Sequence, residues 1–224
     1  MGIADWRRDG FLIFAPGIAA NTVSAASEFT RAIDGNRQQD AWRSVPAVRE
    51  IALDPGVLGM LRMLYEGRRP IPFQTLNFPR GTQQAVHSDT VHFDTDPPGW
   101  MAGVWVALED VHPDSGPLVY YPGSHRLPVH RMESFGLQPK REYYPIYEQA
   151  MANVVAVNRL QPAYATIRRG ECLIWAANLL HGGSPILNPS LSRRSQVTHY
   201  FFEQPGVRFL TPLLGKSRSV SEIQ

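Results

Sequence analysis

From residue 71 onward the chain is a succession of short runs rich in β-branched and aromatic residues, with turn signals between them. Runs of this kind are typical of strands, and clusters of Gly, Pro and Asp are typical of turns. Many short strands in one stretch predict a sandwich or jelly roll. The runs are 71–78 (IPFQTLNF), 84–93 (QAVHSDTVHF), 102–111 (AGVWVALEDV), 116–123 (GPLVYYPG), 163–170 (AYATIRRG), 172–180 (CLIWAANLL) and 195–203 (SQVTHYFFE).

The first third of the chain has a different pattern, because its apolar residues recur at helical spacing. One helix is predicted over 19–35, with Asn21 or Thr22 as its N-terminal cap and a glycine at its end. A second is predicted over 54–67, with Asp54 as cap and a proline at the first helical position. These helices are expected to pack on one outer face of a sheet.

We therefore expect a single domain over 1–224, with a helical N-terminal part at 1–66 and a jelly-roll core at 71–204. Residues 131–155 interrupt the strands with a longer, partly helical insertion. This insertion and the N-terminal helices are the candidates for a lid over the mouth of the barrel.

The charge and the cysteine content exclude several classes of protein. A formal net charge of +2 gives no reason to expect a nucleic-acid or membrane-surface partner. Cys172 is the single cysteine and lies in an apolar run, so we expect a buried, unreactive thiol.

The first apolar stretch spans only about five residues, too few for a signal peptide, and no run approaches the ~18 apolar residues of a membrane span. We expect a cytoplasmic protein.

The segment 85–96 (AVHSDTVHFDTD) contains the pattern His-x-Asp twice, as His87 with Asp89 and as His92 with Asp94. A histidine and an acid two apart on a strand point to the same side, so either pair is suited to holding a metal. Residues 87 and 92 are five apart, and in an unbroken strand they would face opposite ways. The two pairs are therefore not expected to share one metal.

A third ligand is expected far down the chain. His181 follows an apolar run and sits at a Gly-Gly turn, from which its ring can project into a barrel mouth. Two histidines and one carboxylate on one face of a metal are typical of non-haem Fe(II) oxygenases.

Arg193 and Arg194 open the next predicted strand. An arginine there is suited to clamping the far carboxylate of a dicarboxylic keto acid.

The order of motifs along the chain resembles that of the phytanoyl-CoA dioxygenase family. These motifs are His-x-Asp, GVWVALEDV, GPLVYYPGSH, GECLIWAANLLHGGSP and RRSQVTHYFF. The resemblance extends from about residue 9 to about residue 204. It implies a double-stranded β-helix, which is a relative of the jelly roll, as an all-β core with flanking helices. It also implies an enzyme that uses Fe(II), 2-oxoglutarate as co-substrate, and O2.

The resemblance selects between the two His-x-Asp pairs. In the family the metal-binding pair follows a strand like FQTLNF and precedes a Pro-rich turn, and His87 with Asp89 occupies that place. The implied iron ligands are His87, Asp89 and His181. His92 falls at a position where an aromatic is common, so His92 and Asp94 are either pocket or second-layer residues, or ordinary strand or loop positions. Halogenating relatives lack the carboxylate, so Asp89 implies hydroxylation or another oxidative outcome.

The resemblance leaves two registers for the 2-oxoglutarate arginine. Arg193 with Ser195 forms the Arg-x-Ser pairing of related oxygenases and places Tyr200 at the usual aromatic position. Arg194 instead fits the spacing from Asn188. The segment GSPILNPSLSRR carries extra residues relative to the common family spacing, so both registers stay open. We favour Arg193.

Further site residues are implied by position. Gln74 and Asn77 match polar residues that line the 2-oxoglutarate pocket in relatives, and Trp105 matches an aromatic near the co-substrate. The alternatives are hydrogen-bond partners between strands and an ordinary core tryptophan. We interpret His125 as a turn-capping residue and His199 as a core or wall histidine.

The implied reaction is hydroxylation of an unactivated C–H bond in a small-molecule or carrier-linked substrate, with release of succinate and CO2. Two other hypotheses compete with it. A cupin-like metalloenzyme without 2-oxoglutarate would leave the arginine after His181 without a partner. A binding jelly roll with a vestigial site would have no need for two histidines and an aspartate in this order.

Overall fold

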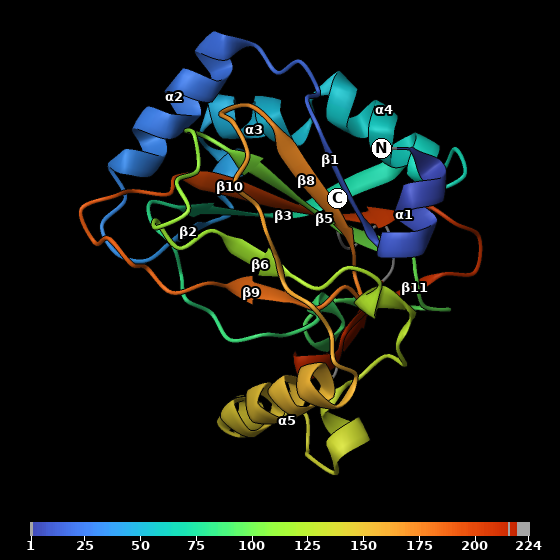
Figure 1. The fold of residues 1–224 in the computed structure, drawn as a ribbon. Coiled ribbons are helices and arrows are strands. Elements are labelled where there is room, and N and C mark those ends of the chain that lie inside the picture. The colour runs from blue at the N-terminus through green and yellow to red at the C-terminus, as the bar shows by residue number, and fades with distance from the viewer. Residues whose placement is uncertain (1, 215, 219–224) are drawn as a thin grey trace.

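The computed structural model describes residues 2–214 and 216–218. Its main sheet has the strand order β1-β8-β5-β10-β3-β2, and every pair of neighbours is antiparallel (Figure 1). Strands distant in sequence are therefore neighbours in space, as in a jelly roll. The bounds are β1 (Phe11–Phe14), β2 (Gln38–Gln39), β3 (Pro70–Phe78), β5 (Met101–Ala107), β8 (Cys172–Ala176) and β10 (Ser195–Phe202).

Two smaller sheets complete the β-structure. One has the order β7-β6-β9 and lies beneath the main sheet in Figure 1; the other has the order β12-β11-β4. β11 and β12 lie beyond residue 204, where the sequence predicts no strand. The bounds are β4 (Asp94–Asp96), β6 (Leu118–Tyr120), β7 (Ala163–Tyr164), β9 (His181–Gly183), β11 (Arg208–Thr211) and β12 (Lys216–Arg218).

The main sheet is buried on both faces, which explains why β5 is apolar along its whole length. Trp105 belongs to a cluster with Leu118 of β6, between the two sheets. Its neighbours Val104 and Val106 belong to the cluster under the N-terminal helices. Alternation along the strand thus supplies two cores, one on each face of the sheet.

The N-terminal helices cover the outer face of the main sheet, as the sequence predicts (Figure 1). The second predicted helix is confirmed as α4, and Oδ1 of Asp54 accepts a hydrogen bond from the Val57 amide at 3.0 Å. The predicted cap of α2 is wrong: the helix begins at Ala20, and Thr22 lies inside it, donating to Glu50. α1 and α3 were not predicted. The bounds are α1 (Ile3–Asp9), α2 (Ala20–Arg31), α3 (Pro46–Ala52) and α4 (Pro55–Leu64).

The insertion forms short 3-10 turns and the helix α5 (Tyr144–Val157), which lies at the lower edge of Figure 1. Tyr147 and Met151 are fully buried and pack against Val91 and Leu180, which flank the segments carrying the candidate metal ligands. The insertion is therefore fastened beside the site. The 3-10 segments of the chain are η1 (Ala41–Arg43), η2 (Asp89–Val91), η3 (Ser124–Arg126), η4 (Met132–Phe135), η5 (Arg141–Tyr143) and η6 (Pro212–Leu214).

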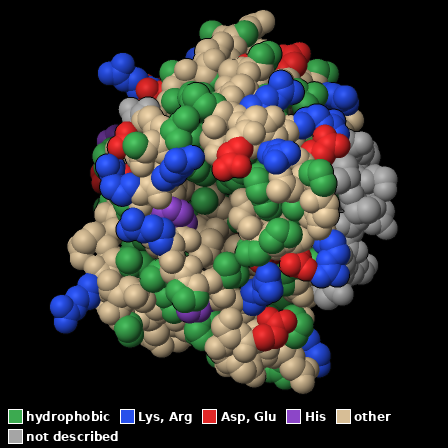
Figure 2. Space-filling view, turned by 90° about the vertical axis from the view of Figure 1, so that its right-hand side faces the viewer, with side chains coloured by type: hydrophobic (Ala, Val, Ile, Leu, Met, Phe, Trp, Pro, Cys, Tyr) green, Lys and Arg blue, Asp and Glu red, His purple; other side chains and the backbone are tan. Residues whose placement is uncertain are grey.

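Acidic and basic side chains are interspersed over the face shown in Figure 2, in keeping with the small net charge. Within residues 2–214 and 216–218, no helix has the length and apolar character needed to cross a membrane.

Candidate metal centre

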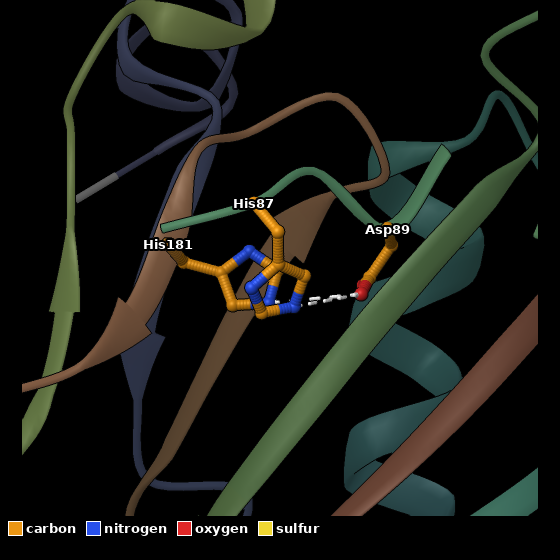
Figure 3. Close-up of side chains that lie close together, drawn as sticks. All are labelled: His87, Asp89 and His181. Carbon is orange, nitrogen blue, oxygen red and sulfur yellow. Dashed lines mark ion pairs between the residues drawn. The ribbon is translucent and has the colours of Figure 1, made fainter. Parts of the chain in front are cut away.

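The structure brings His87, Asp89 and His181 together in the interior between the sheets. Nε2 of His87 lies 3.9 Å and Nε2 of His181 lies 3.6 Å from Oδ1 of Asp89. The three candidate ligand atoms all lie within 4.8 Å of one another, and each residue is about 95% buried. Figure 3 shows both imidazoles turned toward the carboxylate.

Backbone contacts fix this arrangement. His87 and His181 exchange two backbone hydrogen bonds, of 2.9 and 3.0 Å, as an isolated antiparallel bridge. The two glycines after His181 allow that approach: a Cβ on Gly182 would lie 2.8 Å from the Gln84 carbonyl oxygen, and one on Gly183 would lie 2.7 Å from the Gln83 nitrogen. The His-Gly-Gly motif therefore lets the loop of the first histidine lie against β9.

Both histidines present Nε2 to the centre. Nδ1 of His87 lies 2.9 Å from the Ala85 carbonyl oxygen, and Nδ1 of His181 lies 3.0 Å from that of Leu179. A carbonyl only accepts, so each Nδ1 donates to it and each Nε2 is directed at the centre, where that of His87 also lies 3.4 Å from Nε2 of Gln84. Burial, with the neighbouring His181, lowers the pKa of His87 to about 3, so this ring is neutral at pH 7.

The carboxylate of Asp89 is held from its other side. The indole Nε1 of Trp175 donates to Oδ2 at 2.7 Å, and Nε2 of His199 lies 3.5 Å from the same oxygen. Burial opposes ionisation of Asp89, but His181 and His199 outweigh it and hold the pKa below its usual range. Oδ1 is left facing the two imidazoles. Sequence reasoning did not place His199 next to Asp89, although it did expect a wall histidine.

These residues fit a divalent first-row transition metal. Two imidazole nitrogens and one carboxylate oxygen, all on one side of a cavity, form the ligand set that leaves further coordination positions open. The backbone carbonyls on each Nδ1 and the Trp175 indole on Oδ2 provide the outer hydrogen bonds that such ligands need.

A cavity of about 600 Å³ opens in front of this group. Its volume falls within the range of small-molecule sites. Its walls come from all three sheets, from the segment before α3 and from the insertion. Of the predicted site residues, His87, Asp89, His181, Gln74, Trp105 and Arg193 line it.

Arg193 and Arg194 have different surroundings. Arg193 is 2% exposed, and its guanidinium carbon lies 5.4 Å from the centre of the Trp105 ring. Its Nη2 donates to the Arg80 carbonyl oxygen at 3.3 Å, while Nε has no partner. Arg194 instead pairs with Glu109 at 2.5 Å and does not line the cavity. Ser195 is buried with its Oγ unpartnered, and it too lies outside the cavity lining.

Gln74 and Asn77 do not share a face. Gln74 lines the cavity and its Oε1 lies 3.1 Å from Nδ1 of His199. Asn77 is fully buried on the opposite face of β3, where its Nδ2 donates to Thr30 of α2 at 3.1 Å. Residues three apart on a strand point to opposite sides. The structure therefore removes Asn77 from the candidate 2-oxoglutarate residues.

The expectation that residues 84–93 form an unbroken strand is wrong. The 3-10 turn η2 follows Ser88, so His92 turns back and its ring centre lies 6.2 Å from that of His87. His92 lines the cavity and its Nε2 lies 3.0 Å from the Tyr144 hydroxyl. Asp94 points elsewhere and pairs with Arg131. His87 and Asp89 thus belong to the candidate centre. Of the second pair, His92 lines the cavity and Asp94 forms an ion pair with Arg131.

Two further predictions concern residues outside the cavity. Nε2 of His125 lies 3.2 Å from the Arg7 carbonyl oxygen, so this ring joins the 3-10 turn η3 to α1. Burial raises the pKa of the Cys172 thiol, which is fully buried in β8. The burial of Cys172 is as expected, whereas the ring of His125 contacts α1 and does not cap its own turn.

The comparison with known proteins decides the family. The model of the family Phytanoyl-CoA dioxygenase (PhyH) matches residues 58–195. The chain belongs to the phytanoyl-CoA dioxygenase family. Phytanoyl-CoA dioxygenase domain-containing protein 1 of Mus musculus is 31% identical over 90 residues, which are 38% of this chain and 31% of that protein. The match thus spans about a third of the curated relative's length.

Solved structures of similar fold confirm the predicted double-stranded β-helix. The carbocyclase SnoK from nogalamycin biosynthesis has a TM-score of 0.71 at 17% identity, covering 89% of this chain and 82% of its own. EctD from S. alaskensis, solved with 2-oxoglutarate and 5-hydroxyectoine, has a TM-score of 0.69 at 20% identity, covering 91% and 77%. The epimerase SnoN, solved with Fe3+, α-ketoglutarate and nogalamycin RO, has a TM-score of 0.67 at 18% identity, covering 92% and 84%.

Proposed function

We propose that this protein is an Fe(II)- and 2-oxoglutarate-dependent dioxygenase that hydroxylates a C–H bond of a small-molecule or carrier-linked substrate. The observation that carries the proposal is that one cavity is lined both by the His-Asp-His group and by a buried arginine that forms no ion pair with any of the described residues. One domain over 1–224 would carry out this reaction, in the cytoplasm.

His87, Asp89 and His181 are the proposed iron ligands. Bound there, iron would supply the activation of O2 that amino-acid side chains cannot provide. The chain's own contribution is geometry. Trp175 and His199 hold Oδ2 of Asp89, which keeps Oδ1 directed at the two imidazoles. Gln74 holds Nδ1 of His199 at 3.1 Å and so fixes that ring in turn.

Arg193 is the proposed partner of the distal carboxylate of 2-oxoglutarate. Burial lowers its pKa to about 10, which still leaves the guanidinium protonated at neutral pH. Within the described part of the chain, no carboxylate forms an ion pair with it, and its Nε is buried without an acceptor. A buried cation in this state is costly until an anion reaches it. Trp105, stacked against the guanidinium, holds it in place.

The similar structures support this choice of co-substrate and metal, since SnoN was solved with Fe3+ and α-ketoglutarate, and EctD was solved with Fe in one structure and with 2-oxoglutarate in another. The presence of Asp89 supports hydroxylation over halogenation, because a carboxylate fills the place that a halide would need. The surroundings of Arg193 disfavour a cupin-like enzyme without 2-oxoglutarate, which would leave this arginine unpaired. An intact ligand group disfavours a vestigial binding module.

The test is Fe(II)- and O2-dependent conversion of 2-oxoglutarate to succinate and CO2. Wild type is compared with Asp89→Ala and with Asp34→Ala, which removes an exposed carboxylate outside the cavity. We expect succinate from wild type and from Asp34→Ala, and none above background from Asp89→Ala. Equal rates in all three proteins would contradict the proposal.

A further inference from the structure

The outer part of the cavity carries more positive charge than the reaction at its base requires. Three arginines line it: Arg37 precedes β2, Arg43 ends η1, and Arg141 begins η5 in the insertion. Arg37 and Arg43 belong to one segment before α3, Arg141 lies about a hundred residues further along the chain, and all three line the same cavity. Arg193, in contrast, is buried deeper and is accounted for by the co-substrate.

None of these three arginines has an acidic partner among the residues that the structure describes. Ion pairs occupy Arg8, Arg31, Arg69, Arg131, Arg194 and Arg208 elsewhere on the molecule. All three residues are exposed, and the guanidinium carbon of Arg43 lies 5.9 Å from the Trp42 ring centre. Stability of the fold therefore does not explain why they meet here.

Acidic residues do not neutralise this opening. Besides Asp89, the carboxylate that lines the cavity is Asp40, which accepts from the Thr75 amide and from Nε2 of Gln39, both at 3.2 Å. Its charge is thus partly used in holding β2 against β3. Glu148 acts on Tyr144 but does not line the cavity. The opening keeps an excess of positive charge.

Aromatic side chains line the same cavity as these arginines and the candidate ligands. Phe73 and Phe93 meet edge to face with ring centres 5.0 Å apart, and Tyr144 lies 5.2 Å from His92. All four line the cavity. Burial raises the pKa of Tyr144, and the positive charge of Arg37 is one of the influences that oppose this shift. The charge of Arg37 is therefore felt inside the cavity, at the Tyr144 hydroxyl.

We propose that the opening defined by Arg37, Arg43 and Arg141 binds the carboxylate or phosphate of a small anionic substrate whose apolar or aromatic body lies against Phe73, Phe93 and Tyr144. This inference rests on the proposed function, because it names the substrate class of that same site. Arginine recognises both oxyanions through paired hydrogen bonds. Anchoring at the opening would place the body of the substrate in front of the ligand group.

The test uses the full chain loaded with redox-inactive Zn(II) and saturating 2-oxoglutarate, so that the deep part of the cavity is filled first. The probes are 4-phenylbutanoate, 4-phenylbutyl phosphate and the neutral 4-phenylbutanamide, with Kd values from ligand-observed NMR titrations. Wild type is compared with Arg37→Gln/Arg141→Gln. The control is Arg49→Gln/Arg62→Gln, which removes the same charge from exposed positions of α3 and α4.

We expect at least one anion to bind wild type about tenfold more tightly than the amide, and salt to reduce this preference. The control keeps the preference and Arg37→Gln/Arg141→Gln loses it. The tighter of the two anions assigns the group as carboxylate or phosphate. A wild type without anion preference, or a double variant that retains it, overturns the inference.

Binding of 2-oxoglutarate itself is measured in the same samples. If wild type binds 2-oxoglutarate but shows no anion preference at the opening, this inference fails alone. If 2-oxoglutarate does not bind with metal, the proposed function fails, and the probe titrations on the metal-free protein still decide whether the opening selects anions.

Discussion

The indole of Trp175 donates a 2.7 Å hydrogen bond to Oδ2 of Asp89, and this places a fully buried tryptophan directly behind a candidate metal ligand. The ring reaches that position because Gly103 on the neighbouring strand has no side chain: a Cβ there would lie 2.3 Å from the indole. The glycine in β5 and the tryptophan in β8 thus jointly set the orientation of the carboxylate.

Trp175→Phe keeps most of the packing and removes the donor. We expect metal affinity to fall by about ten- to hundredfold, the usual effect of losing an outer hydrogen bond to a ligand. Titration of metal against a competing chelator measures this. Trp6→Phe, which removes a buried indole of α1, is the control and leaves the affinity unchanged. Unchanged affinity in Trp175→Phe would show that Asp89 needs no such support.

Arg193→Gln and Arg194→Gln separate the two candidate clamps. A hydrogen bond to a charged group contributes roughly 1.5–3 kcal/mol, so Arg193→Gln is expected to weaken 2-oxoglutarate binding by about ten- to hundredfold. Arg194→Gln breaks the pair with Glu109 outside the cavity and leaves 2-oxoglutarate affinity unchanged. Isothermal titration in the presence of Zn(II) distinguishes them, and the reverse order of effects would reassign the clamp.

Asn77→Ala and Gln74→Ala test the two faces of β3. The first variant removes the amide that donates to the Thr30 hydroxyl, which still donates to the Ala26 carbonyl oxygen, and is expected to lower the free energy of unfolding by about 0.5–1.5 kcal/mol, with metal affinity unchanged. The second removes the contact to His199 and is expected to lower metal affinity with little loss of stability. Urea denaturation, metal titration and 2-oxoglutarate titration are run on both. A loss of 2-oxoglutarate affinity in Asn77→Ala would restore this residue to the candidate co-substrate site.

His125 predicts a pH dependence of stability away from the metal centre. Burial lowers its pKa in the folded protein below the value of about 6.5 expected in the unfolded chain. The unfolded state therefore binds more protons below that pH, and stability is lost as the pH falls through 6.5. The loss is at most about 1.4 kcal/mol per pH unit for one proton.

His125→Gln removes that titration. Urea denaturation between about pH 7.5 and about pH 5 should show a shallower pH dependence for the variant than for wild type. Parallel curves for the two proteins would mean that the folded-state pKa of His125 is not lowered.

The sequence was most informative where one local pattern decides the structure. Asp54 followed by proline marks the start of α4, and the run of β-branched and aromatic residues in 102–111 marks the strand β5. Motif order identified the family and the group His87, Asp89 and His181, which the structure brings within 4.8 Å.

The sequence was least informative where contacts between distant segments decide. The turn after Ser88 breaks a run that reads as a strand, because the bridge to His181 ends there and the chain turns back. The face of Asn77 is set by its partner on α2. The place of His199 beside Asp89 depends on a strand more than a hundred residues along the chain. None of these relationships leaves a periodic signal.

The most direct test of the central claim is an anaerobic titration of the metal-free protein with Fe(II) and 2-oxoglutarate, following the weak visible charge-transfer band of the chelate. His87→Ala and His92→Ala are measured beside wild type, since both rings line the cavity and only one is assigned to the metal. The account predicts a band in wild type and His92→Ala, and none in His87→Ala. Loss of the band in His92→Ala alone, or no band in iron-loaded wild type, would contradict it.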